Sequence, residues 1–215
     1  MNTKYKNIIF DFDGTLVDTA PDIINCLKKA FYEVLKIKNM NIHRDIIGPP
    51  VNVMIGKLRP DLDAETVEAL TKSFRICYDK SIFPDTYLYD GVKELLIALK
   101  GMKYKIFVVT NKPMLPTKKI LKKLDIDFFD KVITVDYLKE TRLTKSEMIK
   151  CLISEKYIDS KKSLVVGDTQ GDIDAAKENS IDSVAVLYGY GNEIILLKCK
   201  PTIIVKSASV LMSYL

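Results

Sequence analysis

Residues 7–15 of the chain read NIIFDFDGT, a short apolar run that ends in two aspartates and a glycine. An apolar run of this length, bounded by a turn signal, predicts a buried strand. Asp13-Gly14 is also an ordinary turn signal, so the pair by itself establishes no site. The stretch therefore predicts a strand from Asn7 to Phe12 with two carboxylates at its carboxyl end.

Five further apolar, β-branched runs follow, with helix-like segments between them. Val92, Leu95, Leu96 and Leu99, for example, have the spacing of one helix face. Strands that alternate with helices predict a parallel sheet covered by helices. We therefore expect an α/β fold with a doubly wound, Rossmann-like parallel sheet. The further strands are expected from Tyr104 to Thr110, Lys131 to Val135, Ser163 to Gly167, Ser183 to Leu187 and Thr202 to Val205.

The segment from about Pro21 to Ser81 interrupts this alternation, because it shows helical patterns and no convincing strand. Pro21 suits the first turn of a helix. A second helix is expected to include Val51 to Leu58, after the Gly48-Pro49-Pro50 break, and a third to run from about Ala64 to Lys80. We therefore expect a small helical domain, residues 18–82, inserted into a core domain formed by residues 1–17 and 83–215.

The composition is that of an ordinary globular protein, with 47% hydrophobic and 28% charged residues. The net charge of +5 is spread over many lysines with acidic residues between them, which is not the footprint of a nucleic-acid-binding protein. No run approaches the ~20 apolar residues of a membrane helix. Asp11 interrupts the first apolar run, which leaves no signal-peptide segment. We expect a cytoplasmic monomer or homodimer that binds neither nucleic acid nor membrane.

The four cysteines are far apart in the sequence, with no C-x-x-C pair and no cluster with histidine that would hold zinc. A chain in a reducing compartment keeps such cysteines as thiols. We therefore expect buried free thiols at Cys26, Cys77, Cys151 and Cys199.

Polar side chains follow three of the predicted strands at their carboxyl ends, where open parallel sheets bind ligands. Each group alone has a structural explanation as a turn or a helix cap. Together they bring carboxylates, a hydroxyl and backbone amides to one place, and clustered carboxylates usually hold a cation. Oxygen ligands suit Mg²⁺, and a carboxylate such as Asp11 can attack phosphorus. The three groups are Asp11 to Thr15, Thr110 to Lys112 and Gly167 to Asp172.

The order of these motifs resembles that of haloacid-dehalogenase-like hydrolases, in particular the phosphoglycolate phosphatase group. The resemblance covers nearly the whole chain, and it is more specific for the superfamily than for a substrate. The residues that carry it are Asp11 to Asp18, Asp90 to Leu96, Thr110 to Pro113, Lys145, Gly167 to Asp172 and Gly189 to Gly191.

The resemblance implies a role for each motif residue. Asp11 would be the nucleophile and a metal ligand, and Asp13 the general acid/base that also offers its backbone carbonyl to Mg²⁺. Asp168 would be the third protein ligand of the metal, and Asp172 would support the metal through a contact to its ligands or through a water. Thr110 and the backbone amide of Asn111 would hold the transferring phosphoryl oxygens, and Lys145 would be catalytic by neutralising charge on Asp11 and on the phosphate.

Lys145 departs from the form that the close phosphoglycolate phosphatases share, because no proline follows it. A surface lysine at a helix start is therefore the alternative. Arg142, three residues earlier, is a second candidate for phosphate contact, with a plain surface arginine as its alternative.

The resemblance further implies that the inserted helices form a cap that closes over the site, with hinges near residues 17–20 and 81–87. The expected function is Mg²⁺-dependent hydrolysis of a small, phosphoglycolate-like phosphomonoester through an aspartyl-phosphate. The alternatives are a 5'-nucleotidase, a pyrophosphatase, a β-phosphoglucomutase-like mutase and a non-catalytic module that binds phosphate esters. A histidine-based phosphatase is disfavoured, because His43 is the only histidine and lies in the insertion.

Overall fold

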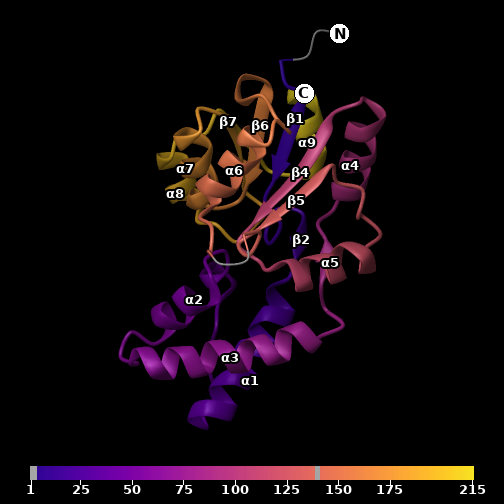
Figure 1. Ribbon diagram of the computed structural model, residues 1–215. Coiled ribbons are helices and arrows are strands. Elements are labelled where there is room, and N and C mark those ends of the chain that lie inside the picture. Colours follow the sequence, from indigo (N-terminus) through magenta and orange to yellow (C-terminus); the bar gives the residue numbers. More distant parts are fainter. Residues whose placement is uncertain (1–3, 139–140) are drawn as a thin grey trace.

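The computed structural model describes residues 4–138 and 141–215, and its central element is a six-stranded parallel sheet (Figure 1). The strand order is β5-β4-β1-β6-β7-β8, so β1 lies between β4 and β6 in the middle of the sheet. All six predicted strands are present, with ends that differ from the predictions by at most two residues. The strands are β1 (Asn7–Phe10), β4 (Lys105–Thr110), β5 (Lys131–Thr134), β6 (Ser163–Gly167), β7 (Asp182–Val186) and β8 (Ile203–Val205).

Helices cover both faces of this sheet, because alternate residues of each strand point to opposite sides. Ile8 and Phe10 belong to the apolar cluster that contains residues of α4, α5 and α9, whereas Ile9 packs with residues of α6 and α7. Figure 1 shows α6, α7 and α8 on one side of the sheet and α4 and α5 on the other. The predicted doubly wound α/β fold is therefore confirmed. The helices are α4 (Val92–Gly101), α5 (Met114–Lys123), α6 (Lys145–Ser154), α7 (Gln170–Glu178), α8 (Glu193–Lys198) and α9 (Ala208–Leu211), with 3-10 turns η2 (Ser160–Lys162) and η3 (Met212–Tyr214).

The insertion after β1 is helical, and in Figure 1 it lies beyond the carboxyl ends of the strands. Two long helices, α1 (Ala20–Leu35) and α3 (Ala64–Lys80), pack against each other through residues that include Leu27, Phe31 and Phe74. The insertion also contains η1 (Arg44–Ile46) and α2 (Val51–Leu58). We call the segment from α1 to α3 the helical insertion.

A short antiparallel ribbon joins the helical insertion to the sheet, and the sequence analysis did not predict it. It pairs β2 (Val17–Asp18) with β3 (Tyr87–Leu88). Each strand has only two residues, too few to show the alternation that identifies a strand in sequence. β2 covers the first half of the segment 17–20 that was predicted as a hinge, and β3 begins at the last residue of the segment 81–87.

The prediction of four free thiols is wrong for one pair of cysteines. Cys26 of α1 and Cys77 of α3 form a disulfide, with 5.7 Å between their Cα atoms, although they lie 51 residues apart in the sequence. The packing of α1 on α3 brings them together, and no local spacing signals that contact. Cys151 and Cys199 are free thiols, the first half-buried and the second buried.

Among the helices in the described ranges, none is long and apolar enough to cross a membrane.

Candidate active site

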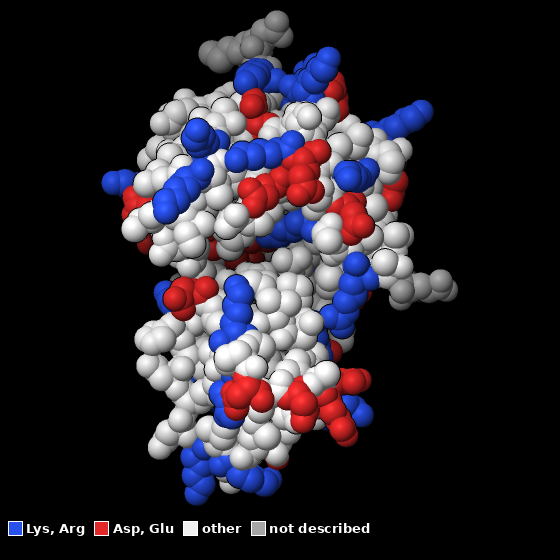
Figure 2. Space-filling view, turned by 90° about the vertical axis from the view of Figure 1, so that its left-hand side faces the viewer, with Lys and Arg blue, Asp and Glu red and all other residues white. Residues whose placement is uncertain are grey.

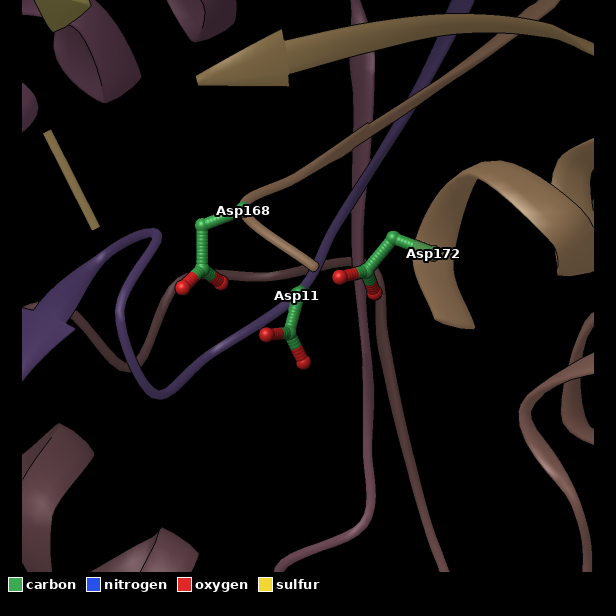
Figure 3. Close-up of side chains that lie close together, drawn as sticks. All are labelled: Asp11, Asp168 and Asp172. Carbon is green, nitrogen blue, oxygen red and sulfur yellow. The ribbon is translucent and has the colours of Figure 1, made fainter. Parts of the chain in front are cut away.

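Three buried aspartates meet at the carboxyl ends of the two central strands (Figure 3). Asp11 directly follows β1, Asp168 directly follows β6, and Asp172 lies in the first turn of α7. One carboxylate oxygen of each lies within 4.8 Å of the others. Because β1 and β6 are adjacent and parallel, the sheet itself brings the first two together.

The electrostatics of this cluster favour a cation. Burial, and then the charges of Asp172 and Asp168, raise the pKa of Asp11 well above its ordinary range, although Lys145 opposes them. Burial and the charge of Asp172 likewise raise the pKa of Asp168 to about 6. Three carboxylates thus share a buried site with one lysine. A bound cation would favour their charged forms, and an all-oxygen donor set suits a hard cation such as Mg²⁺.

The turn after β1 holds Asp168 in place and requires glycine at position 14. Gly14 has a φ of +89°, and a Cβ atom there would lie 2.3 Å from Oδ2 of Asp168. The Thr15 hydroxyl donates to Oδ1 of Asp168 over 3.0 Å, and the backbone N–H of Tyr190 donates to Oδ2 over 2.8 Å. The Asp13-Gly14 pair is therefore a turn, as its sequence suggested. Gly14 also packs directly against the carboxylate of Asp168.

Lys145 lies inside the cluster rather than on the surface. Its side chain is 8% exposed, and its Nζ lies 2.8 Å from Oδ1 of Asp11 and also contacts Oδ1 of Asp172. Burial alone would lower the pKa of Lys145, but the charges of Asp11 and Asp172 more than offset this and raise it. Thr144 and Glu147 form a capping box at the start of α6, which fixes the backbone from which Lys145 projects.

Asp13 lies two residues beyond Asp11, and two donors hold the same oxygen of its carboxylate. The Thr19 hydroxyl donates to Oδ1 over 2.5 Å, and Nζ of Lys112 lies 3.1 Å from the same atom. Lys112 is buried and also donates to the hydroxyl of Tyr78, on α3, over 2.8 Å. Lys112 belongs to the motif from Thr110 to Pro113, but the resemblance gave it no role. A lysine in a loop normally points to solvent.

The predicted phosphate-binding residues lie at the end of β4, next to β1 in the sheet. The Thr110 side chain is buried, and its hydroxyl oxygen accepts a hydrogen bond from the Lys112 backbone N–H over 3.1 Å. The Asn111 amide donates to the carbonyl oxygen of Gly48, in the helical insertion, over 3.0 Å. Neither residue caps α5, whose N-cap is Pro113.

Arg142 has a different position from the other predicted residues. It is exposed and lines an outer hollow of about 540 Å³ that also reaches Asn111 and Lys145. In the described part of the chain no hydrogen bond or ion pair joins Arg142 to the aspartate cluster. The structure thus brings together Asp11, Asp168, Asp172 and Lys145, with Asp13 beside them, and leaves Arg142 outside this group.

The helical insertion lies directly over the site (Figure 1). An opening remains between the insertion and the six-stranded sheet with its covering helices, which we call the sheet domain. Figure 2 shows the indented boundary between the two parts, with acidic and basic side chains along it. A hollow of about 890 Å³ runs along this boundary and is lined by Gly48, Asn111, Lys145 and Thr169, among others.

Arg44 of η1 forms an ion pair with Asp18 of β2. The Asp18 carboxylate also accepts hydrogen bonds from the hydroxyls of Tyr87 and Tyr190, over 2.8 and 2.9 Å.

Comparison with known proteins agrees with this geometry. Residues 8–186 match the family of haloacid dehalogenase-like hydrolases. A phosphoglycolate phosphatase of Colwellia psychrerythraea is 31% identical over 193 residues, which cover 85% of this chain and 84% of that protein. A 5'-nucleotidase of Pseudomonas aeruginosa is 31% identical over 206 residues, covering 93% and 90%. The crystal structure of a predicted phosphoglycolate phosphatase of Haemophilus somnus superposes with a TM-score of 0.86 at 28% identity and covers 99% of both chains.

The chain therefore belongs to the haloacid dehalogenase-like hydrolases. Within that family it resembles the phosphoglycolate phosphatase group, which confirms the resemblance stated from the sequence.

Proposed function

We propose that this chain hydrolyses small phosphomonoesters with the help of Mg²⁺, through a phosphoryl group carried transiently on Asp11. One observation carries the proposal. The buried Asp11 carboxylate lies 2.8 Å from the Lys145 ammonium and within 4.8 Å of Asp168 and Asp172, with Asp13 two residues away. The family of this chain and its phosphatase relatives support a phosphoric monoester hydrolase.

The metal would be held by the carboxylates of Asp11 and Asp168, by the backbone carbonyl of Asp13 and by Asp172, directly or through water. When bound, Mg²⁺ supplies positive charge that neutralises the carboxylates and the substrate phosphate. The donor set supports this assignment, because it contains only oxygen atoms and carries more negative charge than Lys145 alone offsets.

The first chemical step forms a bond between a carboxylate oxygen of Asp11 and phosphorus, while the bond from phosphorus to the ester oxygen breaks. Asp13 gives its proton to the departing oxygen. In the second step water attacks phosphorus, Asp13 takes a proton from that water, and the bond to Asp11 breaks to release inorganic phosphate. Thr110, Asn111 and Lys145 bind the phosphoryl oxygens during both steps.

A 5'-nucleotidase is the second candidate, because the relative of that name from Pseudomonas aeruginosa covers 93% of this chain at 31% identity. The two candidates share the same chemistry at Asp11 and differ in the group that leaves.

A substrate panel tests the proposal. Phosphate release would be measured from 2-phosphoglycolate, several sugar phosphates, nucleoside monophosphates and pyrophosphate, each with Mg²⁺ and with EDTA. We expect turnover with Mg²⁺ that EDTA abolishes and that added Mg²⁺ restores. Release that is fastest from nucleoside monophosphates would favour the nucleotidase, and no release from any ester would refute the proposal.

A further inference from the structure

Asp13 indicates on which side of the phosphoryl group the leaving group lies. In the proposed reaction Asp13 protonates the departing oxygen, so the rest of that group must extend into space that Asp13 borders. Asp13 lines a small cavity between the sheet domain and α3, and it does not line the large hollow along the domain boundary. The leaving group is therefore expected in the small cavity.

This cavity is small and has mainly apolar walls. Its volume is about 40 Å³, which is room for roughly three water molecules if each needs about 10–15 Å³ of such space. Met54 of α2 and Phe74 of α3 contribute apolar surface. A cavity of this volume favours a short leaving group over one as large as a nucleoside.

Two cations line the cavity, and only one of them is paired. Lys112 is engaged with Asp13 and Tyr78. Arg75 of α3 is half-buried, and the described residues 4–138 and 141–215 provide no hydrogen bond or ion pair to its guanidinium. Burial lowers the pKa of Arg75. The charges of Asp79 and Asp136 oppose this shift through space, without a hydrogen bond to the guanidinium. A partly desolvated guanidinium without an acceptor is a binding group for an anion.

We propose that Arg75 is a specificity-determining residue, which binds a carboxylate or similar anionic group carried by a short leaving group of the substrate. This inference rests on the proposed phosphatase function and narrows it. The preferred substrates are small phosphomonoesters with a second negative charge within a few atoms of the ester oxygen. Arg75 lies four residues before Asp79 on α3, so a purely structural ion pair with Asp79 is the competing role.

The experiment compares two esters of similar size in four proteins. The esters are 2-phosphoglycolate, which carries a carboxylate, and 2-hydroxyethyl phosphate, which is neutral at that end. The proteins are wild type, Arg75→Met, Arg75→Lys and Arg59→Met, with kcat/KM as the readout. Arg59 is a matched control, because it lies in the helical insertion but pairs with Asp61 over 2.6 Å, away from the cavity.

We expect Arg75→Met to lower kcat/KM for 2-phosphoglycolate by about 10- to 100-fold, the effect of a lost charge-assisted hydrogen bond, and to change that for 2-hydroxyethyl phosphate by less than about threefold. Arg75→Lys should restore part of the loss, and Arg59→Met should resemble wild type. Thermal melting of each variant shows whether it is folded.

Equal losses for both esters in Arg75→Met would indicate the structural pair with Asp79 and overturn the inference. A wild type that hydrolyses both esters equally well would overturn it too, while leaving the proposed function intact. A wild type that hydrolyses neither of these esters nor any ester of the wider panel would overturn both.

Discussion

The ammonium group of Lys112 lies 3.1 Å from Oδ1 of Asp13 and donates a hydrogen bond of 2.8 Å to the hydroxyl of Tyr78. Asp13 belongs to the sheet domain and Tyr78 to α3 of the helical insertion. The Lys112 ammonium also lies 4.5 Å from the centre of the Tyr78 ring. One buried lysine thus connects the proposed general acid/base to the helical insertion above it.

Replacement of Lys112 should therefore reduce turnover. We expect Lys112→Met to lower kcat by about 10- to 100-fold, because Asp13 loses a charged partner and its side chain is positioned less well. The matched control is Lys118→Met, which changes an exposed lysine on α5. Phosphate release at saturating substrate measures the effect. A Lys112→Met variant that is folded and has the kcat of wild type would show that Lys112 does not position Asp13.

Gly14 should not tolerate a side chain. Its φ of +89° and the 2.3 Å approach of a Cβ atom to Asp168 predict that Gly14→Ala lowers the free energy of unfolding by about 1–3 kcal/mol and weakens Mg²⁺ binding. Gly56→Ala is the control, since nothing lies within 4 Å of a Cβ there. That change, inside α2, should be neutral or stabilise by up to about 1 kcal/mol. Urea unfolding of both variants decides the prediction, which fails if they have equal stability.

The pKa of Asp168 predicts a specific pH dependence. Its value of about 6 in the folded, metal-free protein exceeds the ordinary value of 3.8. The folded state therefore binds this proton more tightly than the unfolded chain. The stabilising contribution of the protonated form is complete below about pH 4 and is lost as the pH rises through about 6. As the pH rises from 5 to 7 in the absence of metal, we expect the Tm of wild type to fall relative to that of Asp168→Asn, whose side chain cannot ionise.

Mg²⁺ binding should show the opposite pH trend, since the ion needs the ionised carboxylate. Added Mg²⁺ should raise the Tm of wild type more at pH 7 than at pH 5, and it should have little effect on Asp168→Asn. Differential scanning fluorimetry with Mg²⁺ and with EDTA measures both effects. An equal Mg²⁺ effect on wild type and Asp168→Asn at pH 7 would contradict the assignment of Asp168 as a ligand.

The Cys26–Cys77 contact predicts which thiols pair on oxidation. Mass spectrometry of peptides from oxidised protein should find one disulfide, between these two cysteines, and free thiols at Cys151 and Cys199. Reduction should lower the free energy of unfolding by about 2–4 kcal/mol, since the bridge closes a long loop. Cys77→Ser should remove this dependence on reductant and Cys151→Ser should keep it. Four free thiols after oxidation would contradict the contact.

The parts of the fold that sequence predicted correctly are those with a strong local signal. The apolar runs of β1 and β6 and the helical spacing of α2 and α3 each identify an element by themselves. The β2–β3 ribbon escaped prediction because two-residue strands have no periodicity. The Cys26–Cys77 bridge escaped it because the contact depends on how α1 packs against α3.

The candidate site divides in the same way. Asp11, Asp13 and Asp168 were found because each lies at the carboxyl end of a predicted strand, and adjacent parallel strands bring such residues together. The sequence assigned no role to Lys112, Tyr78 or Arg75. Their positions depend on how the helical insertion rests on the sheet domain, which no local pattern reports. The neighbouring Thr110-Asn111 pair was the one available signal for Lys112.

The most direct test of the account compares Asp11→Asn with wild type and with Asp127→Asn, an exposed control. Initial rates of phosphate release would be measured with Mg²⁺ and the best substrate of the panel, after melting curves have shown that all three proteins are folded. The account predicts that Asp11→Asn loses turnover by at least about a thousandfold, because its amide cannot attack phosphorus, while Asp127→Asn keeps the rate of wild type. A folded Asp11→Asn protein that releases phosphate at the wild-type rate would contradict the assignment of Asp11 as the nucleophile.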